Sequence, residues 1–207
     1  MTILKITPES EATGLTAEIY DADRQSLGYV PSHTKAMSMN PEAFLAWESL
    51  TKAISTSLGL RRYELVTLAA AQAIGSTHCR LAHGKKTLTI IPEEQLRAIA
   101  RDFHDAGLSE AEVAMMDYAV KLSTHAAAMT DSDALRLREL GFSDREIADI
   151  TMAAAARNFF SRALLALNVD LDVPEELSDE LKNALFAPLP WPHVLPVDSA
   201  PGGPAIT

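Results

Sequence analysis

Several side chains able to do chemistry gather in one short stretch of the sequence, residues 61–88. The stretch holds the chain's single cysteine, Cys79, and two of its six histidines, His78 and His83, with Glu64 upstream of them. A carboxylate, a thiol and an imidazole are the groups that form a proton relay around a nucleophile. This stretch is therefore the first candidate for a catalytic site.

The spacing of these residues predicts how two consecutive helices would present them. Gly75 lets the chain turn and Ser76 is a preferred N-cap residue, so Cys79 is expected at the third position of a helix. Unpaired N–H groups at that end of a helix stabilise a thiolate. His83 follows one turn later on the same face, where its imidazole can take the thiol proton. Glu64 lies near the start of the preceding helix and would orient His83 if the two helices pack together.

Each of these residues also has a plainer interpretation. A single cysteine is most often a small buried apolar residue, and a histidine one turn away from it can be coincidental. Glu64 can be a first-turn partner of the helix dipole, and His78 an exposed residue of its own first turn. Zinc is disfavoured, because no second Cys/His pair has the spacing of a metal site. We expect no metal ion and no cofactor.

Composition excludes several classes of function. The chain has 207 residues and a formal net charge of −10, which argues against nucleic acid and anionic membrane surfaces as partners. One cysteine excludes an intrachain disulfide framework and favours a reducing compartment. The N-terminal residues contain no apolar signal-peptide core, and no apolar run approaches the ~20 residues of a membrane span. We therefore expect a cytoplasmic protein.

Helical patterns run through most of the chain, and strand signals are scarce. Asn40 and Pro41 predict the start of a helix that ends before Gly59. The S-x-x-E patterns that begin at Ser109 and Ser143 predict capping boxes, the second of them opening a long alanine-rich helix. These signals predict an all-α fold.

The composition changes toward the C-terminus. Residues 1–173 are expected to form a single helical domain, whereas proline becomes frequent from Pro174 onward. Residues 174–207 are accordingly predicted to be an irregular extension that can wrap around a neighbouring subunit, with Trp191 as a candidate anchor.

Two further groups of residues are weaker candidates for the site. Residues 157–162, Arg-Asn-Phe-Phe-Ser-Arg, bring polar side chains onto the alanine-rich helix. An interface or an exposed face is the preferred interpretation of that pattern, and contact with the site is the alternative. His33 follows a Val-Pro-Ser turn from which it can approach the pocket, but the sequence gives no distance.

The motif around Cys79 resembles that of a known superfamily. In the AhpD-like alkylhydroperoxidase and carboxymuconolactone decarboxylase superfamily, a Glu is followed by eleven residues and then by C-x-x-C-x-x-x-H, often with a His before the second Cys. Here Glu64 is followed by eleven residues and then by Ser76, His78, Cys79 and His83 in the matching places. Only Ser76 departs from the pattern, since it stands where the first cysteine is expected. The similarity to the peroxidase-related branch extends over residues 27–172.

The resemblance implies an AhpD-like helical bundle that assembles as a trimer or a hexamer. It also implies a thiol-dependent, peroxiredoxin-type antioxidant enzyme. Carried over residue by residue, Cys79 reduces the hydroperoxide, Glu64 and His83 move protons, and His78 is an auxiliary proton carrier. Ser76 cannot form a disulfide, so an external thiol must reduce the sulfenic acid of Cys79. The hydroxyl of Ser76 is expected to cap the helix and hydrogen-bond the thiolate.

The same superfamily leaves two other functions open. In a decarboxylase-like lyase, Glu64 and His83 would be the acid and base acting on a small cyclic carboxylate, and Cys79 would be incidental. In a catalytically degenerate member, the fold would be kept as an oligomeric binding protein. The peroxidase is preferred because the flanking sequence resembles the peroxidase-related branch.

Overall fold

The computed structural model describes residues 2–187 of the chain. Over this range the chain is helical without any strand, which confirms the all-α prediction. None of the helices in the described range is both long and apolar enough to cross a membrane. The helices are α1 (Gly14–Leu27), α2 (Ser32–Met37), α3 (Pro41–Leu58), α4 (Leu60–Ile74), α5 (Thr77–Thr87), α6 (Glu93–Arg101), α7 (Glu110–His125), α8 (Asp131–Glu139), α9 (Asp144–Ala166) and α10 (Asp179–Phe186), with short 3₁₀ turns at Glu9–Glu11, Phe103–Asp105 and Ala126–Ala128.

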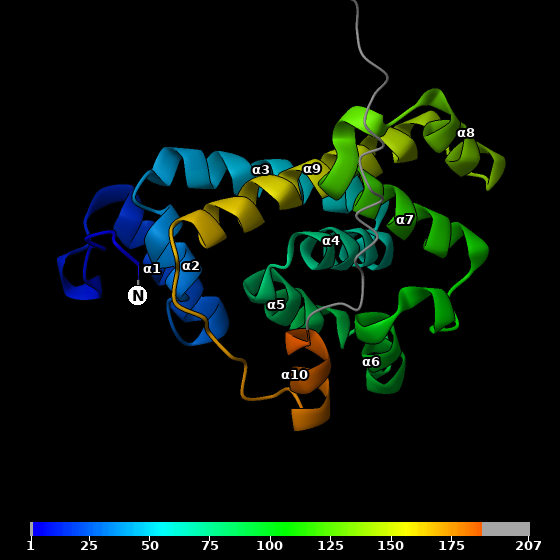
Figure 1. Cartoon of the computed structure of the whole chain (residues 1–207). Coiled ribbons are helices and arrows are strands. Elements are labelled where there is room, and N and C mark those ends of the chain that lie inside the picture. The colour runs from blue at the N-terminus through cyan, green and yellow to red at the C-terminus, as the bar shows by residue number, and fades with distance from the viewer. Residues whose placement is uncertain (1, 188–207) are drawn as a thin grey trace, which may run out of the picture.

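Helix α4 is the central element of the bundle. It packs against α7, α9, α5 and α3, and every residue from Tyr63 to Gln72 is buried. In Figure 1, α3 and α9 lie side by side above α4, while α5 lies below it together with α6 and α10. A helix buried all round must find partners for its polar side chains, because an unpaired buried charge is costly. Glu64 is the charged residue of α4 to which this applies.

The local start signals of the sequence form as predicted. The Asn40 side chain caps α3, with Pro41 at its first position. Both capping boxes are complete, one between Ser109 and Glu112 and the other between Ser143 and Glu146. These caps satisfy N–H groups that have no partner within the helix.

The turn between α4 and α5 sets the position of the cysteine. Gly75 ends α4 with φ +76°, in the left-handed region that favours glycine. Ser76 then occupies the N-cap position and Thr77 is the first residue of α5. Cys79 is therefore the third residue of the helix, as the sequence predicts.

The buried apolar residues form two clusters. The larger one is centred on α4, α7 and α9. The smaller one lies between the N-terminal helices and the α3–α9 pair, and it includes Tyr20, Phe44, Cys79, Phe160 and Leu164. The cysteine is thus embedded in an apolar layer that joins distant parts of the chain.

The prediction that residues 174–207 are irregular is wrong for their first part. Residues 179–186 form α10, which packs against α5 and α6 and buries Leu181 and Leu185 in the larger cluster. Arg80 of α5, itself buried, fixes this arrangement by donating hydrogen bonds to the carbonyl oxygens of Ala184 and Ala187. The helical domain therefore extends through α10, and the remainder of the predicted extension, including Trp191, lies outside the described residues.

Helix α10 packs closely against α5 at Gly84. A Cβ atom on Gly84 would lie 2.7 Å from Cδ1 of Leu185. We expect Gly84→Val to lower the free energy of unfolding, measured by urea denaturation, by about 1–3 kcal/mol, the usual cost of overpacking. Because the clash is with one side chain, Gly84→Val combined with Leu185→Ala should lose less than the sum of the two single losses. Additive losses would contradict the close packing.

Candidate active site

Glu64 and His83 form a buried pair between α4 and α5. Nδ1 of His83 lies 2.6 Å from Oε2 of Glu64, and the two residues are 5% and 2% exposed, respectively. The structure thus brings together the two residues that the sequence places on packed helices. With the Nδ1–H group donated to the carboxylate, Nε2 of His83 carries the free lone pair.

Burial governs the charges of this pair. Burial lowers the pKa of His83, and the charge of Arg157 lowers it further, so the imidazole is neutral at pH 7. For Glu64, burial alone would raise the pKa, but interactions with His83, Lys86 and Arg157 outweigh it and leave the pKa lowered. The pair is therefore a carboxylate that orients a neutral imidazole, which is the arrangement of a general base.

The thiol of Cys79 has different partners from those expected. Its Sγ accepts a hydrogen bond from Nη1 of Arg157 at 3.3 Å and another from the Ser161 hydroxyl at 3.2 Å. Within the described residues no hydrogen bond joins Cys79 to His83, so the predicted proton transfer between them has no direct hydrogen bond to follow in this structure. A cation and a hydroxyl donor both stabilise the ionised form of a thiol.

Ser76 does not have the contacts predicted for its hydroxyl. The residue is fully buried, but its Oγ makes no cap hydrogen bond to α5 and has no partner among the described residues. The expectation that Ser76 caps the helix and bonds the thiolate is therefore wrong in this structure. The hydroxyl that reaches the sulfur belongs to Ser161 of α9.

Within the described residues, His78 forms no hydrogen bond with Glu64 or His83. Its Nε2 lies 3.0 Å from the carbonyl oxygen of Asp170, and the side chain is partly exposed. Its role as an auxiliary proton carrier remains a prediction.

Two adjoining cavities meet at the site. We call the first the thiol chamber; it has a volume of about 530 Å³, and Cys79 and His33 both line it. We call the second the polar chamber; it has a volume of about 650 Å³ and is lined by Glu64. The walls that the two chambers share are Trp47, Glu48, His83, Lys86 and Arg157.

The thiol chamber has an aromatic wall. Trp47 stacks on Phe160 with ring centroids 4.1 Å apart, Phe44 stacks on Trp47, and His33 meets Phe160 edge-on. The guanidinium of Arg157 lies over the rings of Trp47 and Phe160. The sulfur therefore faces an apolar surface with one buried cation beside it.

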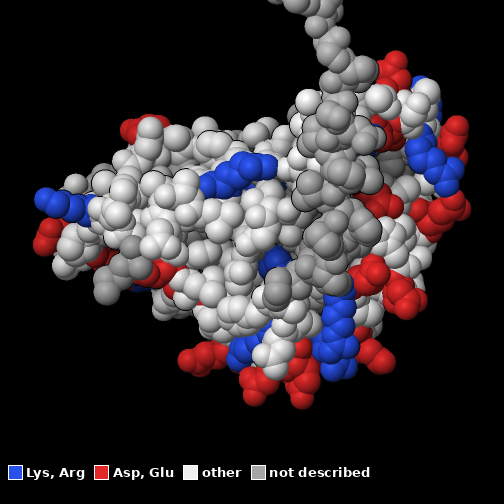
Figure 2. Space-filling view, viewed as in Figure 1, with Lys and Arg blue, Asp and Glu red and all other residues white. Residues whose placement is uncertain are grey.

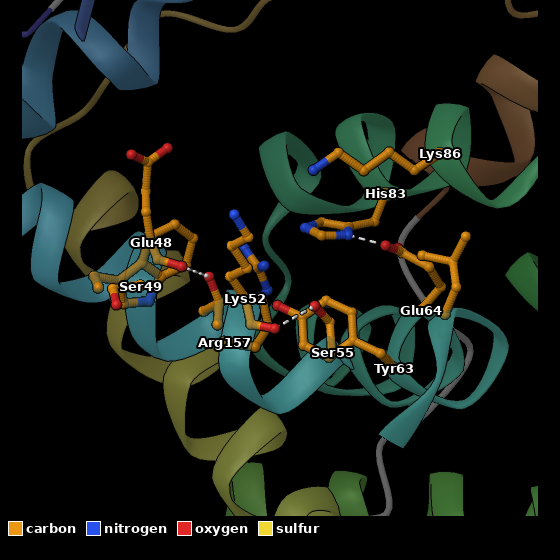
Figure 3. A pocket seen from close by; sticks show the side chains of 12 residues that line it. Glu48, Ser49, Lys52, Ser55, Tyr63, Glu64, His83, Lys86 and Arg157 are labelled. Atoms are coloured by element: carbon orange, nitrogen blue, oxygen red, sulfur yellow. Dashed lines mark hydrogen bonds and ion pairs between the residues drawn. The ribbon is translucent and has the colours of Figure 1, made fainter. Parts of the chain in front are cut away.

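The polar chamber gathers cations. Figure 3 shows Lys86 and His83 of α5 pointing across the cavity toward the side where Lys52 and Arg157 lie. Among the described residues neither lysine forms an ion pair. On the face of the molecule drawn in Figure 2, acidic side chains lie mainly toward the edges, whereas basic side chains also occur in the middle. A local excess of cations stands out in a chain of net charge −10.

Comparison with solved structures places the fold. An uncharacterised peroxidase-related protein of Ralstonia eutropha, described as an alkylhydroperoxidase AhpD core, superposes with a TM-score of 0.75 at 19% identity, covering 90% of this chain and 97% of that one. A peroxidase-related protein of a Silicibacter species gives a TM-score of 0.72 at 24% identity, over 83% and 92% of the two chains. The chain has the AhpD-like fold.

A third AhpD-like structure differs in its described activity. The debrominase Bmp8, in a cysteine-to-alanine variant bound to 2,3,4-tribromopyrrole, gives a TM-score of 0.69 at 20% identity, covering 89% of this chain and 96% of that one. No protein-family model and no curated protein sequence matches the chain. At these identities the comparisons establish the fold, and the function of this AhpD-like chain has to be argued from its own residues.

Sequence reasoning underrated the contribution of α9 to the site. Arg157 and Ser161 are both buried and reach the sulfur, whereas Phe159 and Arg162 of the same segment are exposed. The segment therefore has one buried side and one exposed side. Its preferred interpretation as an interface or exposed face is wrong for Arg157 and Ser161, which lie on the buried side. Their spacing of four residues, which places both on one face of a helix beside Phe160, was the available signal.

Among the described residues no group of three or more His, Cys, Asp or Glu side chains is arranged to hold a metal ion.

Proposed function

We propose that this AhpD-like protein is a one-cysteine, thiol-dependent peroxidase. The observation that carries the proposal is the environment of Cys79, whose sulfur accepts hydrogen bonds from a buried cation and a buried hydroxyl while lining a cavity. A cysteine that served only as an apolar core residue would have no use for a buried guanidinium without a carboxylate partner.

The proposed reaction begins with the thiolate of Cys79. It attacks the terminal oxygen of a hydroperoxide, so that the S–O bond forms as the O–O bond breaks. The departing alkoxide takes a proton from water and leaves as an alcohol, and Cys79 becomes a sulfenic acid. Because the structure offers one cysteine, two molecules of an external thiol then return it to the thiolate through a mixed disulfide.

The thiol chamber suits an oxidant with an apolar body. Its aromatic wall of Phe44, Trp47 and Phe160 accepts an alkyl or aryl group next to the sulfur. The debrominase Bmp8, which has the same fold, forms a complex with a brominated pyrrole. A panel of oxidants should therefore contain a brominated aromatic compound beside alkyl and aryl hydroperoxides.

The test of the proposed function is thiol-dependent consumption of an alkyl hydroperoxide. The unmodified protein should consume it, and the protein should react with a sulfenic-acid trapping reagent after one equivalent of peroxide. Cys79→Ser should abolish both, because it removes the nucleophile. Arg162→Met, an exposed change on the same helix, is the matched control. Full turnover by Cys79→Ser would show that the thiol is not the nucleophile.

A second function is favoured by one observation, the absence of a bond between His83 and Cys79. A Glu64–His83 pair that does not serve the thiol is equally the acid–base pair of a lyase acting on a small carboxylate, with Arg157 and Lys86 as anchors. The two proposals separate cleanly in variants. Lyase turnover of a lactone acid would survive Cys79→Ser and fail in His83→Ala.

We also propose, from the sequence resemblance, that the protein is a homo-oligomer of cytoplasmic location.

A further inference from the structure

The Glu64–His83 pair is a base that the thiol of Cys79 does not use. Of the two chambers, Cys79 lines only the thiol chamber and Glu64 lines only the polar chamber. His83 lines both and lies in the wall between them. The thiolate is already stabilised by Arg157 and Ser161. The free Nε2 of His83 is therefore available for a second reactant, one that needs to lose a proton before it can react.

The cations of the polar chamber indicate the charge of that reactant. Lys52 and Lys86 have no ion-pair partner among the described residues, and Nε of the buried Arg157 has no hydrogen-bond partner there. The two carboxylates of this chamber, Glu48 and Glu64, do not match three cations. Unmatched cations at a cavity attract an anion.

The charge of the site changes during the proposed cycle. While Cys79 is a thiolate, its negative charge complements Arg157. A sulfenic acid in its neutral form leaves Arg157 without that partner, so the charge of the site becomes more positive by one. The attraction for an anion is therefore strongest at the stage at which the enzyme needs its reductant.

We infer that the polar chamber binds the reductant, and that this reductant is a thiol carrying a carboxylate held by Lys52, Lys86 and Arg157. The inference rests on the proposed function, because it assigns the second substrate of the same site. Figure 3 shows these cations and His83 directed toward one space, which places the base beside the bound anion.

The reductive step balances with the residues present. Nε2 of His83 takes the S–H proton of the incoming thiol, and the resulting thiolate attacks Sγ of Cys79. The S–S bond forms as the S–O bond breaks, and the departing hydroxide takes the proton back from His83 and leaves as water. A second molecule of the thiol loses its proton to His83, which passes it to water, and the thiolate then attacks the mixed disulfide. The S–S bond to Cys79 breaks as the new S–S bond forms, so the symmetrical disulfide leaves and Cys79 returns to the thiolate.

The kinetic test compares two thiols of similar shape. The sulfenic acid is formed with one equivalent of cumene hydroperoxide and then reduced by 3-mercaptopropionate or by neutral 3-mercaptopropionamide, at equal thiolate concentration. We expect the acid to react about 5- to 10-fold faster at low salt, and less so at high salt. Lys52→Met with Lys86→Met should remove this preference. Lys182→Met on α10, which lines neither chamber, should keep it.

A binding test requires no turnover. Titration calorimetry with 3-(methylthio)propionate, which has the carboxylate but no thiol, is done at a pH at which iodoacetamide alkylation shows the unmodified protein to hold Cys79 as the thiolate. It should show several-fold tighter binding to Cys79→Ser than to the reduced unmodified protein, because the serine removes the negative charge beside Arg157. Equal binding would refute the charge argument.

The outcomes distinguish the two proposals. If sulfenic acid forms but both thiols reduce it equally, the assigned reductant is wrong and the peroxidase stands. If the preference survives in the double lysine variant, the polar chamber is not the binding site. If no sulfenic acid forms, the proposed function itself fails, and the reductant assignment falls with it.

Discussion

Arg157→Met is expected to slow alkylation of Cys79 by iodoacetamide at neutral pH by about 10- to 100-fold. A hydrogen bond to a charged group contributes about 1.5–3 kcal/mol, and the Arg157 guanidinium donates one to the sulfur from a buried position. Its loss destabilises the thiolate, which is the reactive form. Peroxide consumption should fall in parallel.

Two further variants separate charge from geometry in this experiment. Arg157→Lys keeps the positive charge but loses the planar fork, so we expect an intermediate rate. Ser161→Ala removes a neutral hydrogen-bond donor and should slow the alkylation of Cys79 only a few-fold. Arg162→Met, whose guanidinium is exposed, should react like the unmodified protein. If Arg157→Met folds normally and Cys79 reacts at the unmodified rate, the cation does not activate the thiol.

Part of this site was predictable because it is local. Glu64 and His83 lie on two helices joined by a single turn at Gly75, and helices joined so tightly pack against each other. Capping residues such as Asn40 and Ser143 act within one turn of a helix, so the sequence also predicts where helices begin. Hydrophobic periodicity then suffices for the all-α class.

The rest of the site depends on contacts between distant segments. Arg157 and Cys79 are 78 residues apart in the sequence. No local sequence pattern indicates that α9 packs over the start of α5. The same tertiary contact supplies the donor expected from Ser76, because the hydroxyl of Ser161 is the one that lies within hydrogen-bonding distance of the sulfur. Propensity places Ser76 correctly at the N-cap, but tertiary packing decides where its hydroxyl points.

Helix α10 was missed for a different reason. The proline content from Pro174 onward predicts an irregular region, although this region also contains helix signals. Ser178 is an N-cap residue whose side chain accepts from the N–H of Leu181, acidic residues follow, and Leu181 and Leu185 share one face. Eight residues of consistent local pattern therefore decide the structure here against the composition of the region.

Lowering the pH from 7.5 to 5 is expected to reduce the free energy of unfolding by about 2 kcal/mol for each of two histidines, the partly buried His33 and the buried His83. Burial lowers the pKa of His33 to about 4, and burial, aided by Arg157, lowers the pKa of His83 as well. In the unfolded chain both titrate near 6.5. Between pH 6.5 and 5 the unfolded state therefore binds more protons than the folded state, so acid favours unfolding.

The variant His33→Gln isolates this effect from other titrating groups. Glu64, whose folded pKa is lowered, loses its contribution only below about pH 4.3 and does not act in this window. Burial lowers the pKa of His104, but its bonds to Asp102 and Asp117 outweigh burial and raise it, so this residue stabilises the fold as the pH falls. Urea unfolding at pH 7.5 and 5 should show a loss about 2 kcal/mol smaller in His33→Gln than in the unmodified protein. Equal losses would mean that the imidazole of His33 gains its proton in the folded state, and the chamber around Cys79 would then be wetter than its aromatic wall implies.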